Sequence, residues 1–160
     1  MAVRDAKFAD VPRLAELKEE AKQRSIYANC SVMDPDEVKQ FFTKAIQRHG
    51  HTNNGGTLVL VAEKEGVVEG YIVGLLDSVY PCIKEMWATD LEFYVSDRAD
   101  ALDASKMLRR IEAWAEPNPR VIEVHLGVTD AIGDWKRTSK LYERLGYEPC
   151  GAMFKKRIER

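Results

Sequence analysis

Apolar residues recur at helical spacing near the start of the chain. One face of a helix with about 3.6 residues per turn would carry Val11, Leu14, Leu17 and Ala21. Asp10 stands where it can cap this helix, and Pro12 fits the first turn, where a missing N–H costs nothing. Residues 1–4 come before it and predict a short strand.

A second amphipathic helix is predicted from residue 35 onward. Asp34 can accept a hydrogen bond from a free N–H of the first turn, Pro35 fits that turn, and Glu37 lies at the capping-box position. The apolar face of this helix holds Val38, Phe41, Phe42 and Ala45.

Strand signals follow the two helices. Residues 57–62 and 67–76 are rich in β-branched and aromatic residues and are joined by a turn that ends at Gly66, which predicts a hairpin. A third strand is predicted over residues 86–95. Alternation would place Leu91, Phe93 and Val95 on one of its faces, and Asp90, Glu92 and Tyr94 on the other.

The last third of the chain alternates helix and strand. Five apolar residues at helical spacing predict a helix that ends at Pro117: Ala104, Met107, Leu108, Ile111 and Ala115. Residues 121–128 predict a strand, and a helix capped by Asp130 or Asp134 would end at Gly146. Residues 147–158 predict one or two closing strands. This order indicates a mixed α/β fold over residues 1–160 as one domain.

Composition and charge exclude several classes of protein. The net charge is −2 and the longest basic run is the triplet at residues 155–157, so nucleic-acid binding is not expected. The longest apolar runs are far shorter than the roughly 20 residues of a membrane span, and no signal peptide is predicted. The 3 cysteines form no CxxC pair, so neither disulfides nor a metal site is predicted. We expect a cytoplasmic protein.

Three segments and the order of elements resemble the GCN5-related N-acetyltransferase superfamily (GNAT). The segments are residues 90–95 (DLEFYV), 108–115 (LRRIEAWA) and 141–147 (LYERLGY). Residues 127–128 and 151–155 are similar to a group common in phage and prophage genomes. The resemblance implies a central mixed, mostly antiparallel sheet of six to seven strands flanked by about four helices.

The resemblance also implies acetyl-CoA as co-substrate. Backbone groups of Phe93, Tyr94 and Val95 would bind its pantetheine arm, and those of Ala101, Leu102, Asp103, Ala104 and Ser105 its pyrophosphate. The family has glycine in this loop, but this chain has none between Gly74 and Gly127. Instead it has Asp97, Asp100 and Asp103, with Arg98, Lys106 and Arg109 as the expected compensation. A self-capped helix that needs no phosphate is the alternative.

Two residues would do the acetyl transfer that the resemblance implies. Tyr142 would be the general acid for the leaving thiolate, and the alternative is a core residue on the stripe Ile132, Trp135, Ser139, Tyr142 and Leu145. Glu92 would be the base for the amine, with Asp90 in support on the same strand face, unless both are solvated or paired with basic neighbours. We expect a structural role for His125 and a surface loop for His49 and His51.

Two functions follow for the chain. The first is transfer of an acetyl group from acetyl-CoA to a primary amine by direct attack in a ternary complex. The amine, a small molecule or a peptide, would enter near Tyr27, Asp34 and Asp77. The second is a catalytically degenerate GNAT-fold binding or assembly domain without acetyl-CoA. A homodimer is a possible assembly of either.

Overall fold

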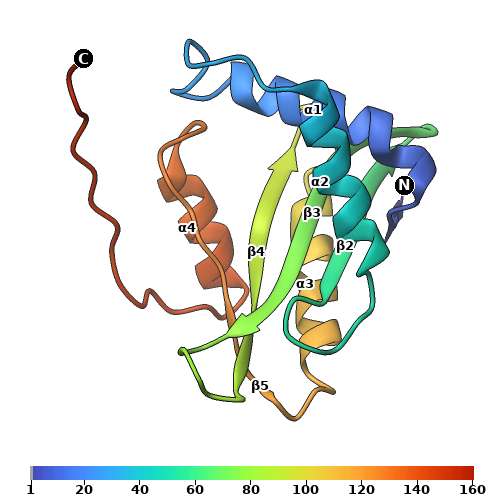
Figure 1. Ribbon diagram of the computed structural model, residues 1–160, viewed down its shortest axis with the longest axis vertical. Helices are drawn as coiled ribbons and strands as arrows, with labels where there is room; N and C mark the ends of the chain where they lie inside the picture. The colour runs from blue at the N-terminus through green and yellow to red at the C-terminus, as the bar shows by residue number, and fades with distance from the viewer. Residues whose placement is uncertain (1) are drawn as a thin grey trace.

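Five strands pair in chain order to form one mixed sheet (Figure 1). The computed structural model describes residues 2–160, so Met1 of the predicted first strand lies outside the described residues. The strands are β1 (Ala2–Asp5), β2 (Thr57–Lys64), β3 (Val67–Ser78), β4 (Met86–Val95) and β5 (Val121–His125). β1 to β4 are antiparallel neighbours, whereas β5 runs parallel to β4.

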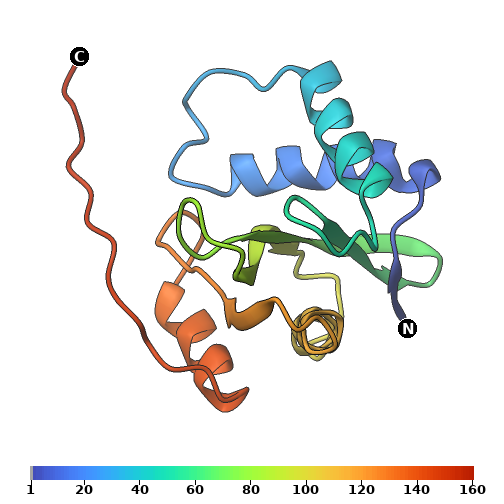
Figure 2. The same ribbon diagram turned by 60° about the horizontal axis from the view of Figure 1, so that its bottom comes forward.

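Four α-helices cover the two faces of this sheet. They are α1 (Val11–Gln23), α2 (Pro35–Gln47), α3 (Asp103–Ala115) and α4 (Trp135–Arg144), and a short 3-10 helix, η1 (Phe8–Asp10), precedes α1. Figure 2 shows α1 and α2 on one side of the sheet and α3 and α4 on the other. The architecture is therefore the mixed α/β layer structure that the order of elements predicts.

Each face of the sheet has its own hydrophobic core because side chains of a strand alternate between faces. Val59, Val61, Tyr71 and Val73 pack with the apolar stripes of α1 and α2. Leu58, Leu60, Ile72, Met86 and Ala88 pack with Met107, Leu108 and Ile111 of α3 and with Tyr142 of α4. The apolar stripes predicted for α1 and α3 are buried here apart from Ala104, which is half-buried, and this confirms the two predicted apolar faces.

Several predicted caps and turns are confirmed. The carboxylate of Asp34 accepts from the N–H of Asp36 at the start of α2, and that of Asp134 does the same for Lys136 at the start of α4. Gly66 in the β2–β3 turn has φ +80°, a conformation that L side chains rarely adopt. The cap predicted for Asp10 is wrong: its carboxylate binds Arg4 and the N–H of Lys7, before α1 begins.

The closing strands predicted for residues 147–158 are wrong. Residues 147–160 have no regular structure, and Figure 1 shows them leading away from α4 as an extended tail. The side chain of Phe154 is 95% exposed. An alternating segment becomes a strand only where another strand edge pairs with it, and this tail makes no such pairing. The sheet therefore has five strands rather than six to seven.

No helix in the described part of the chain is both long and apolar enough to cross a membrane.

Candidate active site

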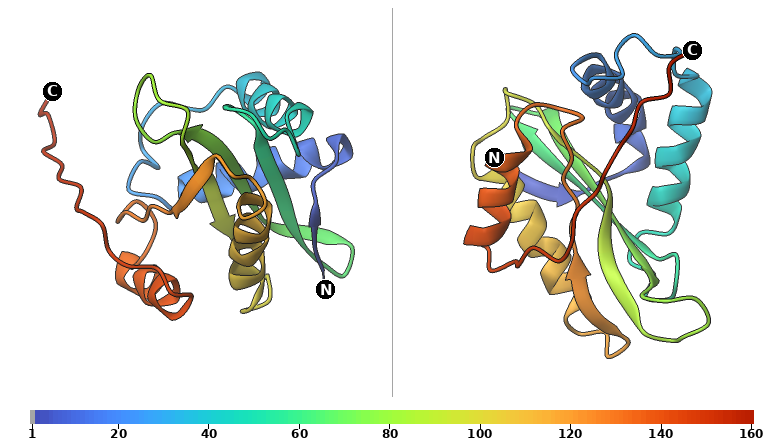
Figure 3. Two further views of the ribbon diagram at one scale, coloured as in Figure 1. Left: turned by 90° about the horizontal axis from the view of Figure 1, so that it is seen from below. Right: turned by 90° about the vertical axis from the view of Figure 1, so that its left-hand side faces the viewer.

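The sheet opens between β4 and β5. Their parallel pairing ends at Thr89 opposite His125, although β4 continues to Val95. The predicted strand at residues 121–128 is therefore shorter than expected, and Val124, still paired with Ala88, lies before the opening. From residue 90 onward, the edge of β4 that faces β5 has no partner strand. Figure 3 shows the short β5 beside the longer strands of the sheet.

A β-bulge at the start of this opening shifts the alternation of the β4 side chains between the two faces of the sheet. Val73 of β3 lies opposite Glu92, but the next residue, Gly74, lies opposite Asp90, so Leu91 is an extra residue in β4. The bulge places Asp90 on the face covered by α3 and α4 and Glu92 on the face covered by α1 and α2. The expectation that both carboxylates share a face is wrong, because it assumes uninterrupted alternation.

On the first of these faces, Asp90 and Tyr142 bind the two backbone groups of one residue, Gly127. The N–H of Gly127 donates to Oδ1 of Asp90 over 3.0 Å, and the Tyr142 hydroxyl donates to the Gly127 carbonyl over 3.1 Å. Gly127 follows the last paired residue of β5, so this cluster spans the opening. A strand residue and a helix residue are thus connected through the two peptide units on either side of the Gly127 Cα.

Burial changes the acid–base behaviour of both side chains. Loss of water raises the pKa of Asp90 from its ordinary 3.8 to about 6, although the N–H of Gly127 opposes this. Tyr142 is 8% exposed, and burial together with the nearby Asp90 carboxylate raises the pKa of its hydroxyl. Tyr142 is therefore a protonated donor at neutral pH. It is also part of the hydrophobic core, which agrees with the core-residue alternative.

On the opposite face, Glu92 is held by a basic side chain. Nζ of Lys18, from α1, donates to Oε1 of Glu92 and lies 5.3 Å from the centre of the Phe41 ring. The Tyr71 hydroxyl is buried near Glu92 and has no hydrogen-bond partner among the described residues. Burial and then the Glu92 charge raise its pKa. Of the alternatives for Glu92, pairing with a basic neighbour is the one found.

The three β4 residues expected to bind pantetheine lie on the unpaired part of the strand. Phe93 and Val95 pack on the α3 side, and Tyr94 packs on the α1 side. The Tyr94 hydroxyl accepts from Arg24 and donates to Glu20. Their side chains are thus used within the fold, while the strand edge beside the opening remains available for backbone contacts.

The acidic loop before α3 is neutralised by residues from other elements. Asp97 pairs over 3.0 Å with Arg24, which directly follows α1, and Asp100 pairs with Lys64 of β2 over 3.3 Å. The expectation that Arg98, Lys106 and Arg109 supply the compensation is mostly wrong, as only Lys106 pairs with one of these aspartates. These long-range pairs leave less negative charge in the loop than the sequence indicates.

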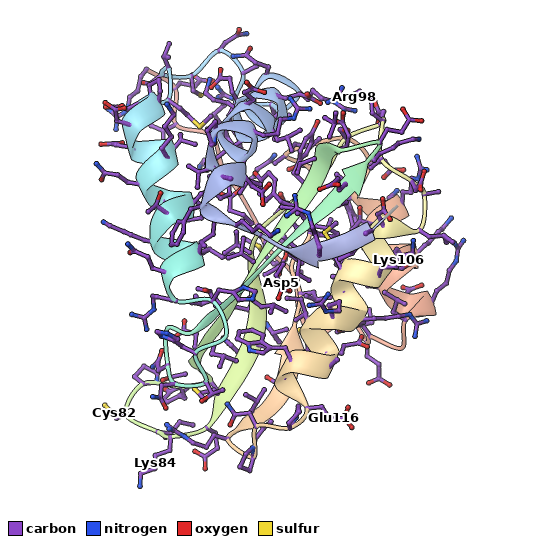
Figure 4. All side chains as sticks on the ribbon, turned by 90° about the vertical axis from the view of Figure 1, so that its right-hand side faces the viewer. Asp5, Cys82, Lys84, Arg98, Lys106 and Glu116 are labelled. Carbon is purple, nitrogen blue, oxygen red and sulfur yellow. The ribbon has the colours of Figure 1, made fainter. Side chains whose placement is uncertain are left out.

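The other two basic side chains have different surroundings. Arg98 pairs with Glu20 and Glu69, away from the loop aspartates (Figure 4 labels Arg98 and Lys106). Arg109 makes no ion pair in the part of the chain that the structure describes. The arginine of the loop thus binds carboxylates of α1 and β3 instead.

Asp103 occupies the start of α3. Its side chain is fully buried, and Oδ2 accepts from the backbone N–H of Asp100 over 3.2 Å. The N–H groups at positions 101, 102, 104 and 105 have no acceptor among residues 2–160. The loop therefore combines a buried carboxylate that binds a backbone N–H of the loop itself with four free donors. These donors fit an anion, and the aspartates oppose it.

The remaining candidate residues lie outside this cluster. His125 stacks on Trp87 with ring centres 4.4 Å apart, and its Nε2 lies 3.2 Å from Sγ of Cys150. Trp135 is 44% exposed at the start of α4. Within residues 2–160, no group of three or more histidine, cysteine or acidic side chains could hold a metal ion.

Sequence reasoning missed two residues of this site. Nothing local marks Lys18, because its partner Glu92 lies 74 residues away. Gly127 was notable only as part of a Gly-Val pair. Its use of both backbone groups depends on the end of the β4–β5 pairing, which no local pattern predicts.

Comparison with known proteins agrees with this architecture. No family model matches the chain, and no curated protein matches it. Among solved structures, a mutant of the BH1408 protein from Bacillus halodurans has a TM-score of 0.72 at 19% identity and covers 99% of this chain and 100% of that chain. A ribosomal-protein-alanine N-acetyltransferase from Brucella melitensis has a TM-score of 0.69 at 23% identity, covering 94% and 86%.

A third similar structure is AAC(6')-Iy in complex with the bisubstrate analog CoA-S-monomethyl-acetylneamine. Its TM-score is 0.68 at 15% identity, over 99% of this chain and 98% of that chain. At such identities the likeness concerns the arrangement of the backbone. The chain therefore has the fold of the GCN5-related N-acetyltransferases.

Proposed function

We propose that the protein transfers an acetyl group from acetyl-CoA to a primary amine by direct attack in a ternary complex. The observation that carries this proposal is the cluster of Asp90, Gly127 and Tyr142 at the point where β4 and β5 part. It puts a buried phenol donor beside an unpaired strand edge. A second carboxylate, Glu92, lies two residues along β4 on the other face.

Residues of this chain fit the parts of acetyl-CoA. The edge of β4 at Phe93, Tyr94 and Val95 would hold the pantetheine arm. The free N–H groups at positions 101, 102, 104 and 105 would hold the pyrophosphate. The co-substrate supplies an activated acetyl thioester. The donors and the strand edge fix its position, which is the chief contribution of binding to a transfer reaction.

Two side chains would move protons in the reaction. Tyr142 is protonated at neutral pH because burial raises its pKa, so it can donate to the thiolate that leaves. Glu92 is the base that takes a proton from the amine, and on its own face of the sheet it does not compete with Tyr142. Asp90, which accepts from the N–H of Gly127, positions the residue whose carbonyl accepts from Tyr142.

The acceptor is a primary amine on a small molecule or a peptide. Tyr27, 47% exposed, is a surface side chain between α1 and α2 that can contact it. The carboxylates of Asp34 and Asp77 already accept from nearby backbone N–H groups, so they contribute charge rather than a free acceptor. Similarity to the phage and prophage group stays a prediction.

The experiment measures acetyl transfer to a panel of amines. The panel contains a polyamine, an aminoglycoside and a peptide with N-terminal alanine, because similar folds include an alanine N-acetyltransferase and AAC(6')-Iy. Products are detected by mass, since the 3 exposed cysteines would interfere with thiol reagents. Tyr142→Phe should lower kcat by roughly a hundredfold or more with little change in KM.

Tyr147→Phe is the matched control. Tyr147 is a second half-buried tyrosine, with its ring centre 6.1 Å from that of Tyr142, but its hydroxyl donates to Glu112. We expect this variant to keep kcat within about threefold, because no step of the transfer uses its hydroxyl. Equal activity of the wild type and Tyr142→Phe, or no transfer to any amine, would contradict the proposal.

The acidic loop favours a second candidate function, a GNAT-fold binding or assembly domain without acetyl-CoA. Its specific support is the buried carboxylate of Asp103, which accepts from the N–H of Asp100 where a phosphate would need donors. A chain of this kind would show neither coenzyme binding nor transfer. A titration of the protein with acetyl-CoA thus decides between the two functions.

A further inference from the structure

One lysine of the protein is held against the carboxylate that the proposed reaction uses as base. Lys18 lies on the inner side of α1, and its ammonium contacts Oε1 of Glu92. The side chains are 21% and 31% exposed. An amine is therefore already present on the acceptor side of β4.

The surroundings of this ammonium are those of an amine-binding site. The Phe41 ring lies 5.3 Å from Nζ of Lys18, and aromatic faces attract cations. The fully buried Tyr71 hydroxyl, with no hydrogen-bond partner among the described residues, adds a polar group beside Glu92. A carboxylate with aromatic neighbours is the combination that would recognise a substrate amine.

The position of Glu92 connects this amine to the opening of the sheet. Glu92 directly follows the bulge at Leu91. The unpaired edge of β4 begins at Asp90, two residues before Glu92. A thioester that binds along this edge would therefore lie beside the backbone of Glu92. Lys18 is the amine already bound at that face.

We propose that Lys18 is an acetylation site of the protein itself, modified within the chain from bound acetyl-CoA. This inference rests on the proposed function. Glu92 takes one proton from the Lys18 ammonium and passes it to water, and the freed nitrogen attacks the thioester carbon. The C–N bond forms and the C–S bond breaks. Glu92 takes the second nitrogen proton, and the coenzyme thiolate takes the proton of Tyr142, which water later restores.

The product has a defined consequence for the site. An acetylated lysine is a neutral amide, so its ion pair with Glu92 is lost. The carboxylate is then free to receive an amine from outside. Self-acetylation of Lys18 would therefore convert a filled acceptor site into an open one.

The test incubates the full chain with acetyl-CoA and maps acetylated lysines by peptide mass. Lys22 is the matched control, because it lies one turn further along α1 and its Nζ donates to the Ala28 carbonyl instead. We expect Lys18 to be acetylated roughly tenfold or more faster than Lys22, at a rate independent of protein concentration. Glu92→Gln should remove this preference, and Lys18→Arg should abolish the gain of one acetyl group.

A second labelling needs no coenzyme. A pulse of acetic anhydride labels each lysine according to how accessible and how far deprotonated its nitrogen is. Glu92→Gln should raise anhydride labelling of Lys18, because the ion pair is gone, while lowering its labelling by acetyl-CoA. Opposite changes support the inference, and a parallel fall in both overturns it.

The outcomes separate this inference from the proposed function. Transfer to an added amine without acetylation of Lys18 overturns the inference and leaves the function standing. Acetylation of all exposed lysines at similar rates also overturns it, because this is uncatalysed chemistry. If acetyl-CoA neither binds nor reacts, both fail together.

Discussion

The substitution Asp90→Asn should make the protein more stable at neutral pH. The ordinary pKa of an aspartate is 3.8, and burial raises that of Asp90 to about 6. The native state thus holds this proton more tightly than the unfolded chain does. Stability falls as the pH rises from about 4 through 6, because the native state must give up a proton that the unfolded chain has already lost.

The size of the effect follows from the same two values. At 1.36 kcal/mol per pKa unit, the ionised Asp90 costs about 3 kcal/mol of stability above pH 7. Asparagine keeps an oxygen that can accept from the N–H of Gly127 over the same 3.0 Å, and it carries no charge to desolvate. Asp90→Asn should therefore recover most of that free energy at pH 7.5 and little of it at pH 4.

Urea unfolding of both proteins between pH 4 and 8 measures this difference. The free-energy gap should grow with pH and level off above about pH 7. Asp77→Asn is the control, since Asp77 is an exposed strand aspartate, and we expect it to change stability by less than about 0.5 kcal/mol. Equal stability of the wild type and Asp90→Asn at pH 7.5, or a gap that does not vary with pH, would refute the reasoning.

Three further predictions concern packing and the tail. Gly74→Ala should lower the free energy of unfolding by about 1–3 kcal/mol, because the new Cβ would lie 2.5 Å from Cδ1 of Ile111. Adding Ile111→Val removes that atom and should recover part of the lost stability, as measured by thermal unfolding. Gly56→Ala should cost more than about 2 kcal/mol in urea unfolding, since its Cβ would lie 2.0 Å from the His51 carbonyl oxygen, a backbone atom. Ending the chain after Cys150 should change Tm by no more than roughly 4 °C.

The glycine variants and the truncation each have a control or a result that would contradict them. Gly151→Ala serves as control for the glycine variants, because nothing lies within 4 Å of its Cβ position, and a cost equal to that of Gly56→Ala would disprove the steric argument. For the tail, the exposed pair between Lys155 and Asp130 is its one ion pair among the described residues, and such pairs contribute about 0–1 kcal/mol. A large fall in Tm on truncation would mean that the tail packs in solution.

Local chemistry made most of the fold predictable. Asp34, Gly66 and Gly146 mark a helix start, a turn and a helix end through interactions within a few residues of each, and all three are found as expected. The closing strands were not predictable in the same way. Whether residues 147–158 pair with another strand depends on an available edge, which their own pattern does not contain.

The candidate site was predictable only in part. Tyr142 was a candidate because residues 141–147 resemble the GNAT superfamily, and its hydroxyl does bind Gly127 at the opening of the sheet. The opposite orientation of Asp90 and Glu92 was not predictable, because one extra residue at Leu91 reverses the alternation. The pairing of Lys18 with Glu92 joins residues 74 positions apart, a distance at which local patterns carry no information.

The central claim is that the opening between β4 and β5 binds acetyl-CoA for transfer to an amine. Calorimetric titration of the purified protein with acetyl-CoA tests it most directly, with thermal unfolding as a parallel readout. The account predicts one binding site, and at 100 times the dissociation constant a stabilisation of about 2.7 kcal/mol, or roughly 5–11 °C in Tm. No heat of binding and an unmoved melting curve at millimolar acetyl-CoA would contradict it.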